Sequence, residues 1–460
     1  MKLSELERKM AGSTKGVLFM LSLATAIMLV CVYLNYSKQF TMMTLYSLKS
    51  LKLQVYWTDK NDYTSVSEGC EVPRGGYKAW NDGIVTSLRP AIRRNCVRLF
   101  EGDNEEAERV KEESKKWANA LGDDAFLKTA SSCSWLKEQL TNSLFNSELE
   151  REFPVAFAFV IHNSPQQIFR LLKVLYKPQN TYCFHYDKKS TPQFKSLFDT
   201  MASCFDNIII PSKIEDVQWG KHTFLDAQVN CLRDLAKHRE TRPKALQWRY
   251  VINLCGKELP LTTGKEIVSR LMRLNGTSAM SPGPNTNKQR LKGKKVPFNL
   301  PTYKNSAYNA LSFQFVDYIL NNETAQAVLK FFRNVSVPEE HFYSTLYKQP
   351  GIPGGFNPNV PQEDYFRVAR ALWCFRKDCL SICKGKWVHS VCIVVSGDLP
   401  RVLDYQRGDG YLFHNKYFME MDHTVMDCAE EIVVAINIQE YIDECRSTET
   451  QSDEDSGSGS

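Results

Sequence analysis

The alternation of short apolar strands with amphipathic helices in the middle of this 460-residue chain constrains its fold more than any other feature. Residues 155–162 form a continuous apolar run typical of a buried strand, and residues 166–176 follow with apolar side chains at helical spacing. The same pattern predicts further strands at 182–186, 208–210 and 250–254, with helices near 194–201 and 223–237. Strands that alternate with helices predict an α/β fold with a mostly parallel sheet flanked by helices.

Two residues stand where ligands bind in sheets of this kind. In open α/β sheets, ligands lie beyond the carboxyl ends of the strands. His162 closes the first predicted strand, and Asp187 directly follows the second. Their position makes both residues candidates for a binding site. Beyond Leu274 the alternation ends, and residues 281–305 are rich in proline, glycine, asparagine and lysine, which predicts an exposed loop.

The N-terminal region predicts a retained membrane anchor. Residues 16–34 contain no charged residue, and their length is close to the ~20 residues that a spanning helix needs. No small-residue cleavage site follows, which disfavours a cleaved signal peptide. Basic residues are more frequent before the span than just after it, so the positive-inside rule predicts a cytosolic N-terminus and a luminal body. The expected organisation is a cytosolic tail at 1–15, a transmembrane signal anchor at 16–34, a stem at 35–90, a luminal domain at 91–446 and a disordered tail at 447–460.

The cysteine content agrees with a luminal body. Thirteen of the fourteen cysteines follow the predicted span, and disulfides form in oxidising compartments. Glycosylation sequons at Asn275, Asn322 and Asn334 are compatible with this location, while a fourth at Asn35 lies very near the predicted membrane. The net charge of +6 arises from 58 basic and 52 acidic residues, a mixture too even to predict a nucleic-acid partner.

Several common catalytic motifs are absent from the sequence. It contains no HExxH, GxSxG or GxxxxGK[ST] pattern, which excludes the commonest zinc-protease, serine-hydrolase and P-loop classes. The single Asp-x-Asp pattern, at 453–455, lies in the predicted disordered tail, so no metal site is expected. If the chain transfers a sugar from a nucleotide, a protein cation must then neutralise the leaving diphosphate.

Residues 337–346, which read VPEEHFYSTL, are the best candidate for a segment that carries a catalytic base. The simpler interpretation is a helix start, because proline followed by acidic residues favours the first turn of a helix. Trp373 and Phe375 have a similarly simple interpretation as core aromatics.

Six segments carry a family resemblance, at 176–190, 202–210, 250–261, 337–346, 390–399 and 412–418. In this order they resemble the core 2 and I-branching β-1,6-N-acetylglucosaminyltransferases, glycosyltransferase family 14, over roughly residues 95–430. The resemblance implies a GT-A-like fold in a single catalytic domain and a type II Golgi membrane protein. It also implies inverting, metal-independent transfer of N-acetylglucosamine from UDP-GlcNAc, in β-1,6 linkage, to a galactose- or N-acetylgalactosamine-containing O-glycan of a glycoprotein. No cofactor is expected, and a homodimer is left open.

The resemblance also implies roles for single residues. Glu340 matches the family's catalytic base, and Lys416 matches the lysine that binds the diphosphate. The nucleotide-sugar pocket would be lined by Val160, His162, Asp187 and Trp219. Trp373 and Phe375 fall near the family's acceptor-side aromatics, with a gap of one residue, and Lys288 and Arg290 match its acceptor loop.

The chain departs from the family pattern in two places. His389 stands where the family has a second, arginine ligand to the diphosphate, and a histidine lacks the fixed charge of arginine. Either Lys384 or Lys386 substitutes for it, or donor binding is weak. The acceptor-loop glutamate of the family is missing, because residues 281–305 contain no acid. Loss of such a contact is expected to change acceptor specificity.

The resemblance further implies four disulfides, with Cys255 as a free thiol. The expected bridges are Cys96 with Cys428, Cys133 with Cys204, Cys183 with Cys231, and Cys383 with Cys392. Four cysteines have no family counterpart, namely Cys70, Cys374, Cys379 and Cys445.

Two functional hypotheses of different classes follow. The first is the sugar transfer described above, which the retained Glu340 and Lys416 favour. The second is a catalytically impaired relative that binds glycans or modulates partner enzymes in the Golgi, which His389 and the missing acid favour. Transfer of xylose, as in more distant relatives, is a further alternative that differs only in the donor.

Overall fold

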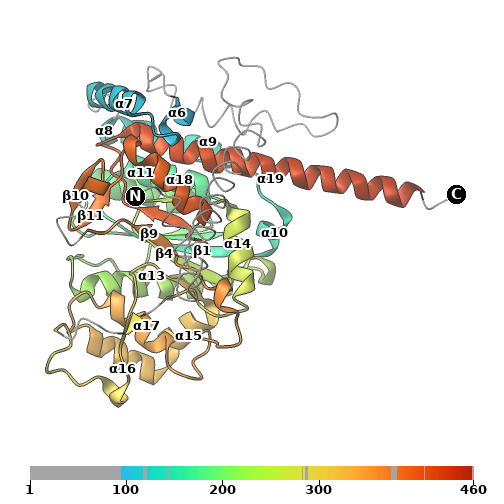
Figure 1. The fold of residues 1–460 in the computed structure, drawn as a ribbon. Helices are drawn as coiled ribbons and strands as arrows, with labels where there is room; N and C mark the ends of the chain where they lie inside the picture. The colour runs from blue at the N-terminus through green and yellow to red at the C-terminus, as the bar shows by residue number, and fades with distance from the viewer. Residues whose placement is uncertain are drawn as a thin grey trace, which may run out of the picture. The chain divides into compact units, whose positions relative to one another are not determined.

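The computed structural model describes residues 95–117, 122–141, 145–281, 283–284, 289–374, 381–408 and 410–457 (Figure 1). It confirms the predicted alternation of strands and helices. The observed elements are β1 (Val155–Ile161), α11 (Pro165–Leu175), β2 (Thr181–Tyr186), α12 (Pro192–Cys204), β3 (Ile208–Ile209), α13 (His222–Thr241) and β4 (Tyr250–Leu254). Helix α12 begins two residues before its predicted start, because Pro192 occupies the first turn and the Thr191 side chain accepts a hydrogen bond from the amide of Phe194.

The central sheet has five strands in the order β3-β2-β1-β4-β8. The first four strands are parallel, and β8 (Ala310–Ser312) is antiparallel to β4. The sheet is therefore mostly parallel, as predicted, and with its flanking helices it fits a GT-A-like fold. The register pairs Ile161 with Tyr186, so β1 and β2 end side by side.

Alternate side chains of β1 enter two different hydrophobic clusters, because successive residues of a strand point to opposite faces of the sheet. Phe157 and Phe159 pack in a cluster with residues of α11 and α12. Ala156 and Ala158 pack in a second cluster with residues of α13 and of the helices after β8. Figure 1 shows α11 on one side of the sheet, and α13 and α17 (Glu339–Tyr347) on the other. Both faces of β1 are thus buried, which explains its continuous apolar run.

Further helices and several short strands lie around this core. The helices are α6 (Cys96–Phe100), α7 (Asn104–Trp117), α8 (Asp123–Thr129), α9 (Cys133–Thr141), α10 (Glu148–Glu152), α14 (Gly264–Arg273), α15 (Phe313–Asn321), α16 (Glu323–Phe332), α18 (Leu399–Gly408) and α19 (His423–Gly457). A three-stranded sheet joins β5 (Glu258–Pro260), β12 (Phe413–Asn415) and β9 (Ala369–Ala371). A hairpin joins β10 (Lys386–Val388) and β11 (Val391–Ile393).

The expectation of a plain exposed loop at 281–305 was incomplete. Within it, β6 (Gly283–Pro284) pairs with β7 (Tyr303–Lys304). The carbonyl oxygen of Tyr303 accepts a 2.9 Å hydrogen bond from the Ser344 hydroxyl, so β7 is anchored to α17. This tertiary contact leaves no trace in the local composition.

All four expected disulfides are present, and Cys255 is a free thiol. Cys374 and Cys445, which the resemblance left unassigned, are also disulfide-bonded. Cys70 and Cys379 lie outside the described residues.

Helix α19 continues to Gly457, past the point where the sequence predicts a disordered tail. A helix that has already formed can extend at one hydrogen bond per residue, without a new nucleation step. In the part of the chain that the structure describes, no helix combines the length and the apolar character that a membrane crossing requires. The predicted cytosolic tail, anchor and stem at 1–15, 16–34 and 35–90 lie outside that part.

Candidate functional site

The carboxyl ends of β1 and β2 bring three predicted donor-site residues together. The amide of Asp187 donates a 2.8 Å hydrogen bond to the Ile161 carbonyl, and the Ser190 hydroxyl donates to the His162 carbonyl at 2.9 Å. The Asp187 carboxylate is buried and accepts a 2.8 Å hydrogen bond from the Lys189 amide. Val160 is buried in β1 one residue before its end. These contacts fix His162 and Asp187 at one edge of the sheet.

Besides burial, Lys257 and Lys416, which come from other segments, both lower the pKa of His162. Partial burial, and then the ammonium group of Lys257, lower the pKa of His162, and Lys416 acts in the same direction. The imidazole is therefore neutral at neutral pH. Lys416, the predicted diphosphate ligand, directly follows β12, and Lys257 directly precedes β5. The sequence analysis missed Lys257, although its place four residues after Asn253 of β4, just past the strand's carboxyl end, was a usable signal.

His389 lies in the tight turn of the β10–β11 hairpin. His389 and Ser390 have φ values of 49° and 64°, which form the turn between the two strands. The His389 ring lies 5.6 Å from the ring of Trp219, measured between centroids. Trp219 is 80% exposed, so this predicted donor-site residue is accessible rather than part of the core.

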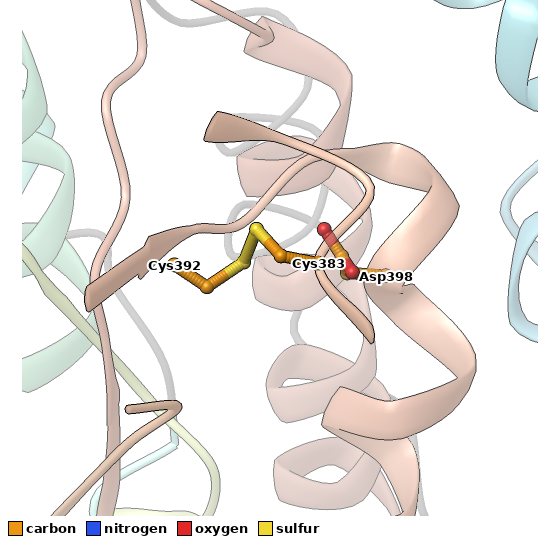
Figure 2. A group of neighbouring side chains, drawn as sticks. All are labelled: Cys383, Cys392 and Asp398. Carbon is orange, nitrogen blue, oxygen red and sulfur yellow. A yellow bond between two sulfur atoms is a disulfide. The ribbon is translucent and has the colours of Figure 1, made fainter. Parts of the chain in front are cut away.

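A disulfide and a buried carboxylate hold the start of the same hairpin (Figure 2). Cys383, Cys392 and Asp398 are spaced like metal ligands, but the two sulfur atoms are bonded to each other and so are not thiolate ligands. The Asp398 carboxylate accepts hydrogen bonds from the amides of Lys384 at 3.0 Å and Val395 at 3.2 Å. The disulfide and the Asp398 carboxylate therefore have a structural role and hold the hairpin in place.

The candidate base lies in the first turn of α17. The Oε2 atom of Glu340 accepts a 2.6 Å hydrogen bond from Nη1 of Arg290. The Lys304 ammonium lies 3.4 Å from the same oxygen. The structure thus joins the predicted base to one predicted acceptor-site residue. Lys304 is a second cation that the sequence analysis did not identify. Lys288 lies outside the described residues.

The adjacent carboxylates of Glu339 and Glu340 differ in burial and in ion pairing. Glu339 is buried, and this burial raises its pKa to about 7, whereas the Glu340 side chain is 21% exposed and ion-paired. The helix-start interpretation is also correct, since α17 begins directly after Pro338. Of these two carboxylates, only Glu340 is therefore accessible from the surface.

A backbone contact joins the base to the Trp219 segment. The Val337 amide donates a 2.9 Å hydrogen bond to the Gly220 carbonyl. Val337 has a φ of 51°, a conformation that is costly for a β-branched residue and that often marks functional sites. The segment before α13 and the start of α17 are thereby held together.

The predicted acceptor aromatics are only partly described. Trp373 is 51% exposed and forms a bridge with Val391 of β11, so it is not a core residue. Phe375 lies outside the described residues. Asn275, Asn322 and Asn334, the predicted glycosylation sites, are all exposed.

Comparisons with known proteins agree on one family. Residues 155–368 match the family model described as Core-2/I-Branching enzyme. The chain is 30% identical to a beta-1,3-galactosyl-O-glycosyl-glycoprotein beta-1,6-N-acetylglucosaminyltransferase 4 of Danio rerio, over 76% of this chain and 86% of that protein. It is 30% identical to the beta-1,3-galactosyl-O-glycosyl-glycoprotein beta-1,6-N-acetylglucosaminyltransferase of Homo sapiens, over 73% of this chain and 84% of that protein.

An N-acetyllactosaminide beta-1,6-N-acetylglucosaminyl-transferase of Mus musculus is 32% identical, over 62% of this chain and 73% of that protein. By their names, the matched relatives thus act on two kinds of acceptor.

Proposed function

The chain belongs to the Core-2/I-branching enzyme family and is a glycosyltransferase, and from this premise we propose that it transfers N-acetylglucosamine from UDP-GlcNAc, in β-1,6 linkage, to a galactose- or N-acetylgalactosamine-containing O-glycan of a glycoprotein. The observation that carries the proposal is Glu340, a part-exposed carboxylate that is held by Arg290 at the start of α17. Its neighbour Glu339 is buried and unsuited to contact a substrate.

The proposed reaction is a single displacement with inversion. Glu340 accepts the proton of the acceptor C6 hydroxyl as that oxygen attacks the anomeric carbon of the donor. The bond between the anomeric carbon and the phosphate oxygen breaks, and UDP leaves with the electron pair. An α-linked donor then gives a β-linked product. One base and a stabilised leaving group are sufficient, because no covalent intermediate forms.

The donor would bind at the carboxyl ends of β1 and β2. Val160, His162, Asp187 and Trp219 would line the nucleotide-sugar pocket, and the fixed charge of Lys416 would stabilise the leaving diphosphate without a metal ion. On the acceptor side, Arg290 and Trp373 would contact the glycan. Their exposure and their positions near Glu340 and β11 support this assignment.

We further propose a Golgi location with a single N-terminal anchor and a luminal catalytic body. Four disulfides between described cysteines and three exposed sequons support an oxidising, glycosylating compartment. The apolar run at 16–34 supports the anchor.

A transfer assay on the full-length protein tests the proposed reaction. Wild type is incubated with UDP-GlcNAc and an O-glycan panel in the presence of EDTA, and the product linkage is determined by NMR. Glu340→Gln should lower turnover by roughly 100- to 10,000-fold. Glu339→Gln, which changes the adjacent carboxyl, is the matched control and should retain transfer. Parallel reactions with UDP-xylose test the alternative donor.

A second candidate function is favoured by one observation, His389 in place of a fixed cation. If wild type binds glycans but transfers no sugar to any acceptor, the chain acts as an impaired member that binds glycans or modulates partners. Loss of turnover in EDTA that Mn²⁺ restores would instead refute the metal-independent mechanism.

A further inference from the structure

Three lysines from separate segments surround the ring of Phe418. The ammonium nitrogen lies 5.1 Å from the ring centroid in Lys416, 5.2 Å in Lys257 and 5.9 Å in Lys386. We call these three residues the lysine cluster. A cation over an aromatic face is stabilised by the ring, so Phe418 helps to hold like charges close together.

Lys257 is the most unusual member of the cluster. It is only 5% exposed, and its ammonium group donates a 2.6 Å hydrogen bond to the Ser164 hydroxyl, just before α11. Across the described ranges, no carboxylate forms a salt bridge with any of the three ammonium groups. Burial lowers the pKa of Lys257, and Glu420 and Asp123, which do not form a salt bridge with it, favour its charged form. A buried ammonium without an adjacent counter-ion is costly, which points to a ligand that supplies the negative charge.

One buried carboxylate fixes two members of the cluster relative to each other. Glu258 accepts hydrogen bonds from the amides of Cys255, Gly256 and Lys257 at 2.9–3.2 Å. It also accepts one from the side-chain amide of Asn415 at 3.2 Å. Because Asn415 directly precedes Lys416, Glu258 ties the loop of Lys257 to the strand end of Lys416.

The third member comes from the clamped hairpin. Lys386 is the first residue of β10, and the Cys383–Cys392 disulfide and Asp398 hold the segment that leads into it (Figure 2). His389, at the far end of this hairpin, contacts Trp219 instead of Phe418. Lys384 is exposed, and its backbone amide is bound to Asp398. The geometry therefore distinguishes Lys386 from Lys384.

We propose that Lys257 and Lys386 bind the diphosphate of the nucleotide-sugar donor together with Lys416, so that the lysine cluster supplies the charge that is missing at His389. This inference rests on the proposed function, because it assigns a ligand within the same donor site. A leaving diphosphate carries several negative charges, and preorganised cations are the usual means of stabilising such charge in a dry site. Lys257 donates its hydrogen bond to Ser164, two residues after His162, and Lys416 shares the Phe418 ring with Lys257, which places both lysines near the end of β1 and the proposed donor pocket.

Binding of UDP to the full-length protein in EDTA, measured by calorimetry, tests the inference. Lys257→Met and Lys386→Met should each weaken UDP binding by roughly 10- to 100-fold, the effect of losing a charged hydrogen bond. Neither change should weaken binding of uridine, which lacks phosphate, by more than about threefold in ligand-observed NMR. Lys384→Met is the matched comparison on the same hairpin and should bind UDP like wild type.

Further measurements separate a loss of UDP binding from a loss of folding. Thermal unfolding shows whether Lys257→Met remains folded. If Lys257→Met does not remain folded, Lys257→Arg, which keeps the charge, should retain UDP binding. The UDP affinity of Lys386→Met, a change at an exposed position, then tests whether the lysine cluster binds the diphosphate.

Three outcomes would overturn the inference. If wild type transfers N-acetylglucosamine but Lys386→Met and a folded Lys257 variant without charge bind UDP normally, the inference is wrong and the proposed function stands. A loss of binding in Lys384→Met, with none in Lys386→Met, also overturns it. If wild type binds no uridine nucleotide at all, the proposed function fails, and the inference fails with it.

Discussion

Arg290 donates a 2.6 Å hydrogen bond from Nη1 to Oε2 of Glu340, and the two side chains are 22% and 21% exposed. The proposed base is thus paired with a cation from the loop that is proposed to bind the acceptor. Lys304 lies 3.4 Å from the same carboxylate oxygen. In the proposed reaction, the acceptor hydroxyl would meet a carboxylate that is already oriented by these cations, and preorganisation of this kind lowers the cost of reaching a reactive geometry.

Arg290→Ala should raise the KM for the acceptor by roughly tenfold, the effect of losing one charged contact, while the KM for UDP-GlcNAc changes little. Steady-state kinetics with each substrate varied in turn measure this. Lys292→Ala, an exposed change on the same loop, is the control and should leave both constants near wild type. An equal rise in both KM values would contradict an acceptor-side role for Arg290.

Glu339→Gln should change the pH dependence of stability. Burial raises the pKa of Glu339 from about 4.5 to about 7. Between these values the folded state binds a proton that the unfolded state has lost, so the free energy of unfolding falls as pH rises. The full shift corresponds to about 3 kcal/mol. Relative to wild type, the glutamine variant should gain up to about this amount between pH 5 and pH 8 in denaturant titrations. A stability difference that does not vary with pH would show that Glu339 does not titrate in this range.

Of the four expected disulfides, the one with the longest and the one with the shortest sequence separation should differ in their effect on stability. Cys96–Cys428 closes a sequence separation of 332 residues, and Cys383–Cys392 closes one of 9. In the chain-entropy model, removal of the longer link costs ~3 kcal/mol more. Paired alanine substitutions, compared by unfolding under non-reducing conditions, measure the difference. UDP affinity should follow the opposite order, because the shorter link holds the hairpin of Lys386. If the shorter link can be removed with no loss of UDP affinity, the hairpin does not need this clamp.

Trp219→Ala should separate binding from stability. Trp219 is 80% exposed, so its removal should change the free energy of unfolding by no more than about 0.5 kcal/mol. The KM for UDP-GlcNAc should rise several-fold, because Trp219 would line the donor pocket beside His389. Met272→Ala, at a 45% exposed position on α14, is the control for removal of a large exposed side chain. An unchanged KM for the donor would remove Trp219 from the pocket.

The sheet could be predicted because its determinants are local. The apolar run of β1 and the helical spacing of α11 are periodic signals within a few residues, and the structure confirmed both. The positions of His162 and Asp187 at strand ends followed from the same pattern. The four disulfide pairings came through the family resemblance and were all confirmed.

The chemistry of the site depended on contacts that periodicity does not encode. Glu339 and Glu340 are adjacent and identical in type, and only packing decides that one is buried and the other meets Arg290. Lys257, Lys386 and Lys416 are far apart in the chain and meet only because three separate segments pack around Phe418. The sequence by itself therefore determined the order of strands and helices and the family, since those signals repeat over short distances. Only the tertiary structure decided which charged groups face one another, because burial and Coulomb interactions depend on distances in space rather than along the chain.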